Sequence, residues 1–196
     1  EMAARVQATL PPGIEVDLDA TYVSMFSYKA KNYALLEASG EVRLSGAALK
    51  SRGLEPFQRR CIREVVTLLL EGRAAEVPPL WDDYARRIRE RTLPLEDFVQ
   101  RENLTISPEA YAQKLAKGTT RRSAAYELAL RADTPFRQGD SVQFYVTGTR
   151  RKCAVVDNCR LYEGVEPETR DENTAYYLDK LGQLKAKFDE ALPGLS

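Results

Sequence analysis

Apolar and polar side chains alternate between Val23 and Tyr33, and an apolar run continues to Leu36. This pattern predicts one β-strand whose end is buried. Successive side chains of a strand point to opposite faces, so Lys29 and Lys31 would lie on the same face, beside Tyr33. We therefore expect two lysines to project from one side of a rigid strand.

Two shorter alternating stretches flank this strand. Residues 14–18 alternate apolar with acidic side chains, and residues 41–44 follow a turn that contains Gly40. Each stretch predicts a further strand. The three strands would form a small antiparallel sheet, which needs helices against one face to be stable.

Helical spacing replaces the alternation after Gly46. Apolar residues recur every three or four positions from Pro56 to Leu69, and Gly72 would end that helix. Pro78 and Pro79 would open a second helix, because proline is tolerated in a first helical turn. Further helices are predicted after two good N-caps, Ser107 and Asn173, and at residues 124–131.

The remaining segments complete the expected fold. Residues 1–10 have the spacing of the last turns of a helix, and residues 142–146 alternate as a strand. A basic turn at residues 148–152 would lead into a returning strand at 153–156. The predicted fold class is α+β: a small antiparallel sheet followed by a mostly helical part that contains a β-hairpin.

The composition is that of a soluble globular protein, with 196 residues, 43% hydrophobic and 30% charged. No apolar run is long enough to span a bilayer, and the N-terminus has no signal pattern, so we expect a cytoplasmic protein without a membrane partner. The chain has no histidine, which excludes imidazole catalysis and histidine-bound metals. Its three cysteines lack Cys-x-x-Cys spacing, and we interpret them as packed thiols.

Charge is unevenly distributed along the chain. The formal net charge is zero, which argues against a generally basic nucleic-acid binder, yet residues 27–63 hold eight basic and three acidic residues, a net charge of +5. Lysines on a strand can reach phosphates, or the minor-groove acceptors that every base pair presents. The alternative is a surface strand whose lysines are merely solvated.

A second basic candidate lies before residues 124–131. Gly118, two threonines, Arg121 and Arg122 precede that helix. Free backbone N–H groups and the helix dipole both favour anions at such a position, which suits a phosphate. No Gly-Lys-Ser sequence follows, so a nucleotide P-loop is not indicated.

The order of several motifs resembles family B DNA polymerases. Lys29-Ala-Lys31-Asn-Tyr33-Ala, then Gly40, Gly46 and Leu-Lys50-Ser-Arg52-Gly, resembles the end of the palm and the start of the thumb in that family. The family has a Lys-Lys-Arg-Tyr segment there, on which the primer–template duplex rests. Lys31 and Tyr33 match its second lysine and its tyrosine, whereas Ala30 and Asn32 depart from it. Arg52 matches the latter arginine of an Arg-Arg pair, with Ser51 replacing the former.

The resemblance continues over roughly residues 14–190. Leu-Glu-Asp-Phe at 95–98, Ser-Pro-Glu-Ala-Tyr at 107–111, the alanine-rich segment 123–130, residues 139–145 and Asn-x-x-Tyr-Tyr at 173–177 occur in the order of a polymerase thumb. It implies a palm-edge sheet in residues 1–46 and a thumb subdomain in 47–196. The implied partners are double-stranded primer–template DNA and the rest of the polymerase chain, in replication or repair. The candidate DNA-binding residues are Lys29, Lys31, Asn32, Tyr33, Lys50, Arg52, Arg121 and Arg122.

Catalysis is not expected from this chain alone. Polymerisation needs two metal ions held by carboxylates, and the resemblance implies that these lie upstream, in an Asp-Thr-Asp turn that nothing here matches. Asp17 and Asp19 have the nearest spacing, which a surface strand explains. We predict no catalytic or metal-binding residue here, and we assign Mg²⁺ to the parent polymerase.

Glu1 before Met2 is not a natural translation start and suggests an excised fragment.

Two alternatives remain open from the sequence. One is a non-catalytic module derived from an inactivated polymerase that binds duplex or protein, which the eroded Lys-Lys-Arg-Tyr pattern favours. The other is a soluble α+β interaction domain without a nucleic-acid role, in which the charged runs are ordinary solvated surface.

Overall fold

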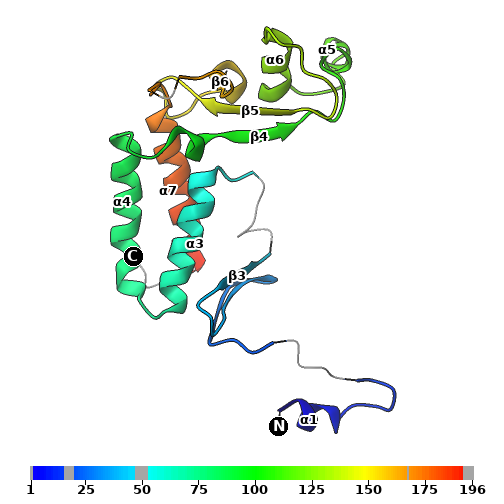
Figure 1. Ribbon diagram of the computed structural model, residues 1–196, viewed down its shortest axis with the longest axis vertical. Coiled ribbons are helices and arrows are strands. Elements are labelled where there is room, and N and C mark those ends of the chain that lie inside the picture. Colours follow the sequence, from blue (N-terminus) through cyan, green and yellow to red (C-terminus); the bar gives the residue numbers. More distant parts are fainter. Residues whose placement is uncertain (1, 16–19, 47–52, 167, 192–196) are drawn as a thin grey trace.

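The computed structural model describes residues 2–15, 20–46, 53–166 and 168–191 (Figure 1). Three antiparallel strands form a first sheet in the order β1 (Ser24–Lys29), β2 (Asn32–Leu36), β3 (Val42–Ser45). Tyr28, Ala34 and Val42 point from this sheet into the main hydrophobic core. That face packs against helix α3 (Pro56–Leu70), which meets the need of so small a sheet for a covering layer.

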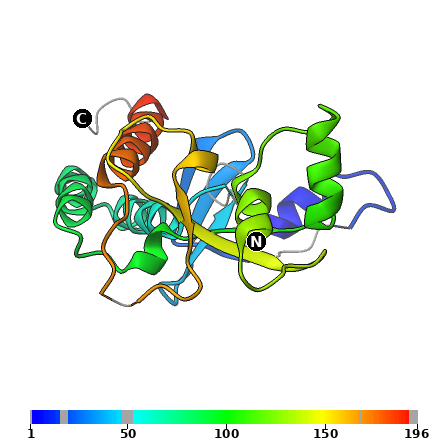
Figure 2. The ribbon, with the colours of Figure 1, turned by 90° about the horizontal axis from the view of Figure 1, so that it is seen from above.

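The main core lies among three helices and this sheet. Helix α3 packs beside α4 (Val77–Arg89), and α4 packs on the long C-terminal helix α7 (Thr174–Ala191), as Figure 2 shows from above. Phe98, in the 3-10 turn Leu95–Phe98, lies with its ring centroid 4.4 Å from that of Tyr177. The Tyr177 hydroxyl donates to the Phe98 carbonyl at 3.2 Å and lies 2.7 Å from the Val146 N–H. This tyrosine therefore joins α7 to the second sheet.

The second sheet has the order β4 (Gln100–Asn103), β5 (Ser141–Val146), β6 (Cys159–Leu161), again antiparallel. Two short helices, α5 (Pro108–Ala116) and α6 (Ala124–Arg131), lie beside it at one end of the molecule (Figure 1). Their tyrosines, Tyr111 and Tyr126, stack at 4.5 Å. Val142 and Phe144 complete this smaller core. The α+β prediction is confirmed.

Both predicted N-caps are present. Ser107 Oγ accepts the Ala110 N–H at 3.2 Å, and Asn173 Oδ1 accepts the Tyr176 N–H at 3.0 Å. The Asn173 amide also donates to the carbonyls of Thr147 and Arg150, at 3.1 and 3.0 Å. One side chain thus starts α7 and fixes the turn that follows β5.

The prediction of a single strand through Lys31 is wrong. The chain reverses at Ala30 and Lys31, and β1 and β2 pair as a hairpin, with Phe26 opposite Ala34 and Lys29 opposite Asn32. Lys31 has φ 63°, in the left-handed region, and the Asn32 amide donates to the Ala30 carbonyl at 2.9 Å across the turn. Alternation persists through a two-residue turn, and no glycine marks it, so the pattern imitates one long strand.

Two further strands differ from expectation. The strand that returns after β5 is β6 at residues 159–161, not 153–156, and residues Val155–Asp157 form a 3-10 turn instead. Of the predicted strand at residues 14–18, the first two residues are not in a strand, and the rest lie outside the described residues. The sheet gains its third strand from the hairpin turn at Lys31.

The N-terminal helix α1 (Met2–Gln7) lies apart from the helical bundle, at the far end of the molecule in Figure 1. Its presence agrees with the expected helical turns at residues 1–10. Among the helices that the structure describes, none combines the length and the apolar character needed to cross a membrane.

Candidate nucleic-acid interface

The β1–β2 turn carries the lysine that the sequence singled out. Lys31 is exposed at the tip of the turn, and the Asn32 side chain is partly buried beneath it. Lys29 closes β1 opposite Asn32, and its side chain lies outside the described part of the structure. Lys29 is thus the last residue of β1 and Lys31 lies in the turn, so the two lysines do not share one face of a strand.

Gly46 ties this turn to the segment that follows. Its φ is +93°, and a Cβ built there would overlap the Lys31 carbonyl oxygen and the Asn32 side-chain oxygen and lie 2.7 Å from the Asn32 Cα. Only glycine fits so close an approach at this backbone conformation. Gly46 is the last described residue before residues 47–52, which include Lys50 and Arg52 and lie outside the described part of the structure.

Tyr33 lies on the outer face of the first sheet, turned away from α3. It pairs with Ser27 and with Ser45 across the strands, while its neighbour Ala34 is fully buried on the inner face. Val23 and Met25 share the outer face and are 68% and 62% exposed. This face therefore has an aromatic residue near the lysine turn and exposed apolar side chains at the other end of β1.

A hollow of about 240 Å³ opens between the start of α3 and strand β4. It is lined by Gly53, Leu54, Arg59, Val99, Gln100, Arg101, Glu102 and Phe144. Arg59 comes from the first turn of α3 and Arg101 from β4, and both are exposed. Arg101 Nε donates to Ser141 Oγ at 2.6 Å. Among the described residues, neither arginine forms an ion pair with a carboxylate.

Two other arginines of the basic segment, Arg43 and Arg60, are paired with carboxylates. Arg43 lies 2.8 Å from Glu37, and Arg60 lies 2.5 Å from the buried Asp97. Burial raises the pKa of the Asp97 carboxyl, and the Arg60 charge acts in the opposite direction. Glu37 is already counted in the net charge of +5, whereas Asp97 lies outside residues 27–63, so the sequence count overstates the free charge by the Arg60–Asp97 pair. On α3, Arg59 and Arg63 have no ion pair among the described residues, and Arg63 donates to the Val42 carbonyl at 3.5 Å.

The Gly118–Ser123 loop holds its two arginines differently. Arg122 donates to both oxygens of Glu127, at 2.6 and 2.7 Å, and lies 2.7 Å from Asp157. These hydrogen bonds lower the pKa of Glu127. Arg121 is exposed and has no ion pair within the described residues. Of the two candidates, Arg121 is open to a phosphate, whereas Arg122 fastens α6 to the turn before β6.

Comparison with known proteins identifies the family of this chain. The family model described as DNA polymerase family B matches residues 1–187. The chain belongs to the family B DNA polymerases. The chain is 23% identical over 181 residues to a DNA polymerase of Methanocaldococcus jannaschii, which is 91% of this chain and 10% of that protein.

The fold of this polymerase chain also matches a solved structure. The family B DNA polymerase of the hyperthermophilic archaeon Pyrobaculum calidifontis superposes with a TM-score of 0.72 at 19% identity, over 97% of this chain and 24% of that one. The chain thus spans a small part of the length of both proteins, and it shares the fold of that part.

Sequence reasoning missed Arg101 at the candidate interface. Its signal was weak, since it is one exposed residue on a four-residue strand. It lines the same hollow as Arg59 because β4 passes the start of α3, where the Gln100 amide donates to Glu55 at 2.9 Å. Asp17 and Asp19, the nearest match to a metal pair, lie outside the described residues. Within the described part of the polymerase chain, no three Cys, Asp or Glu side chains gather closely enough to hold a metal ion.

The cysteines of the described chain are free thiols. Cys61 is fully buried in α3, and Cys153 and Cys159 are partly buried. Burial raises the pKa of the Cys159 thiol to about 11, so it is protonated and unreactive at neutral pH. All three fit the interpretation of packed thiols.

Proposed function

We propose that this chain is the part of a family B DNA polymerase that grips the primer–template duplex in replication or repair. In this proposal, residues 1–46 form the edge of the palm, residues 47–196 form the thumb, and the polymerase active site is supplied by the rest of the chain. Membership of the family and the placement of the unpaired cations support it.

The observation that carries the proposal is the hollow between α3 and β4. Two exposed arginines, Arg59 and Arg101, line it, and among the described residues neither is paired with a carboxylate. Planar guanidinium groups bind phosphate oxygens in pairs, and they are weakly hydrated, so such a pair suits a DNA backbone. Glu102 also lines the hollow, and it accepts a hydrogen bond from Ser123, 3.1 Å away.

The lysine turn and the hollow lie at opposite ends of one segment. Gly46 contacts the Lys31 turn, and Gly53 lines the hollow. Seven residues can span at most roughly 25 Å. Duplex DNA carries one charge per roughly 1.7 Å of its axis, so one duplex could meet Lys31, Lys50, Arg52, Arg59 and Arg101 together.

Such contacts would not depend on base sequence. Phosphates would supply the affinity, and Lys29, Lys31 or Tyr33 could test pairing through the minor-groove acceptors that all base pairs share. Catalysis would require carboxylates and Mg²⁺ from the remainder of the polymerase. The chain itself would position the duplex and orient it toward that site.

A second candidate is a non-catalytic module of an inactivated polymerase that retains duplex or protein binding. Ala30, Asn32 and Ser51 stand where the family motifs have basic residues. The loss of these charges favours this candidate, because each removes one potential phosphate contact. Primer extension by this chain joined to its upstream polymerase region would decide between the two.

The proposal is tested by titrating the 196-residue chain with fluorescent duplex at several salt concentrations. We expect Arg59→Ala, Arg101→Ala and Lys31→Ala each to weaken binding and to lower the salt slope by about one unit if a phosphate is contacted. Lys185→Ala is the matched control, because Lys185 lies on α7 and is paired with Asp189 at 2.8 Å. Equal effects of all four substitutions would mean that only bulk charge matters.

A further inference from the structure

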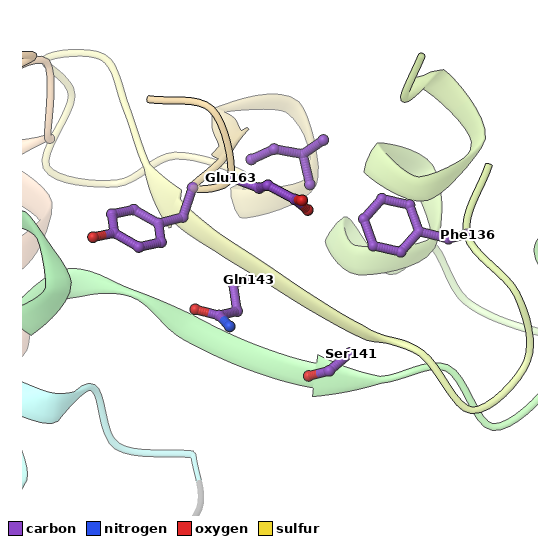
Figure 3. Close-up of a pocket in the computed structure, with 6 residues that line it drawn as sticks. Phe136, Ser141, Gln143 and Glu163 are labelled. Atoms are coloured by element: carbon purple, nitrogen blue, oxygen red, sulfur yellow. The ribbon is translucent and has the colours of Figure 1, made fainter. Parts of the chain in front are cut away.

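A second cavity lies on the far side of Arg101, at the edge of the second sheet. It has a volume of about 350 Å³ and is lined by Phe136, Ser141, Gln143, Leu161, Tyr162 and Glu163. Figure 3 shows the Phe136 ring across the cavity from Gln143 and Ser141, with the Glu163 side chain reaching between them. The volume is at the small end of the range of about 300–1,000 Å³ for ligand pockets, which suits one planar group.

The cavity exists because β6 is shorter than β5. Strand β6 pairs with β5 only at Phe144, Tyr145 and Val146, and the Tyr162 N–H donates to the Gln143 carbonyl at 2.9 Å just beyond. The chain then leaves the sheet, so the edge of β5 at Ser141 is not covered by β6. Phe136, from the loop that precedes β5, closes the other side.

The lining combines aromatic rings with hydrogen-bonding groups. Phe136 and Tyr162 both line the cavity, and the Tyr162 hydroxyl donates to Glu96 Oε1 at 2.7 Å, which restrains that ring. The Gln143 amide both donates and accepts, and Glu163 adds a carboxylate acceptor. Ser141 Oγ accepts from Arg101, so its hydroxyl proton remains free to donate.

Arg101 connects this cavity to the basic hollow. It lines that hollow, and its Nε bonds Ser141 in the wall of the cavity. A nucleotide whose phosphate met Arg101 would therefore have a cavity lined by two aromatic residues close by. Base–aromatic stacking and a cationic track for the backbone are the two parts of single-strand recognition.

We propose that this cavity, named here the β5-edge pocket, binds one unpaired nucleobase of the DNA strand held at Arg59 and Arg101, and that it prefers guanine. This inference rests on the proposed duplex-binding function. Guanine is favoured because its ring N–H and exocyclic amine lie side by side and can donate together to the two oxygens of Glu163. Adenine, cytosine and thymine do not present two adjacent donors on one edge.

The experiment compares fluorescent duplexes that have a single-stranded overhang of abasic sugar-phosphate. The overhang carries no base, one guanine, or one inosine, which lacks the exocyclic amine. Charge is equal in all three, so phosphate contacts are matched. The 196-residue chain is tested beside Phe136→Leu, which removes the ring and keeps an apolar side chain, and Glu163→Gln, an exposed and nearly isosteric change.

For the unaltered chain we expect the guanine overhang to bind roughly 5- to 150-fold more tightly than the abasic one, the range that stacking of one base supplies. Phe136→Leu should remove most of this gain. Glu163→Gln should keep the stacking gain and abolish the preference for guanine over inosine. Blunt duplex, bound equally by all three proteins, shows that each variant is folded.

Equal binding of the guanine and abasic overhangs, with blunt duplex still bound, would overturn the pocket and leave the proposed function intact. A gain of guanine over the abasic overhang that survives Phe136→Leu, or a preference for guanine over inosine that survives Glu163→Gln, would also overturn it, since the base would then bind elsewhere. Failure of the unaltered chain to bind blunt duplex would instead contradict the proposed function. If Phe136→Leu does not fold, Glu163→Gln alone decides, because its loss of the guanine preference is measured on a folded protein.

Discussion

Gly46→Ala should destabilise the protein more than Gly40→Ala, although both replace a glycine of positive φ that flanks strand β3. The backbone strain is shared, since φ is +93° at Gly46 and +86° at Gly40, and it costs about 1–2 kcal/mol for an L-residue. A Cβ at Gly40 meets nothing within 4 Å, whereas at Gly46 it overlaps the Lys31–Asn32 turn. Overpacking of this kind adds about 1–3 kcal/mol.

The free energy of unfolding from urea titrations measures both changes. We expect a loss of about 1–2 kcal/mol for Gly40→Ala and of about 2–5 kcal/mol for Gly46→Ala. Where Gly46→Ala remains folded, it should also weaken duplex binding, because the Lys31 turn is pushed away from residues 47–52. Equal losses of stability for the two variants, or unchanged duplex affinity for Gly46→Ala, would refute the close contact as the link between turn and interface.

Three further predictions concern stability and catalysis. Arg122 lowers the pKa of Glu127, so the stability that this pair contributes is present above the unfolded pKa of about 4.3 and is lost as the pH falls through the lower folded pKa. When the free energy of unfolding is measured against pH, Arg122→Ala should therefore reduce its fall at acidic pH, whereas Arg121→Ala should not. Asn173→Ala should cost about 1–3 kcal/mol in urea unfolding, more than Ser107→Ala at about 1 kcal/mol, because it removes an N-cap and two bonds to carbonyls. Primer extension by the isolated chain with Mg²⁺ and four nucleotides should be absent; extension that survives repurification and is lost when Asp17 and Asp19 become asparagine would show that an active site had been overlooked.

Features set by local chemistry were predictable from the sequence. Ser107 and Asn173 start helices because a short polar side chain next to an apolar-periodic run satisfies the free N–H groups of the first turn. Pro56 fits the first turn of α3 for an equally local reason. The family resemblance was also readable, since it rests on the order of short motifs.

Features set by contacts between distant residues were not predictable. The turn at Lys31 has no glycine, and its left-handed backbone is supported by Asn32 and by the approach of Gly46. Arg122 looked like a phosphate ligand, and only the fold places Glu127 and Asp157 around it. Arg101 lines the same hollow as Arg59 only because the fold brings β4 to the start of α3, where Gln100 donates to Glu55. The periodicity of a sequence predicts which face of a helix or strand a residue lies on. It does not predict which charged residue from another element lies beside it.

The central claim is that the chain grips duplex DNA through its unpaired cations, and a salt titration of the unaltered chain tests it most directly. The account predicts a dissociation constant of about 10⁻⁴–10⁻⁶ M near physiological salt, little difference between duplex sequences, and a linear fall of log affinity with log salt. The slope should correspond to several phosphate contacts, at about 0.9 units each. No detectable binding even at low ionic strength, or an affinity that does not change with salt, would contradict the account.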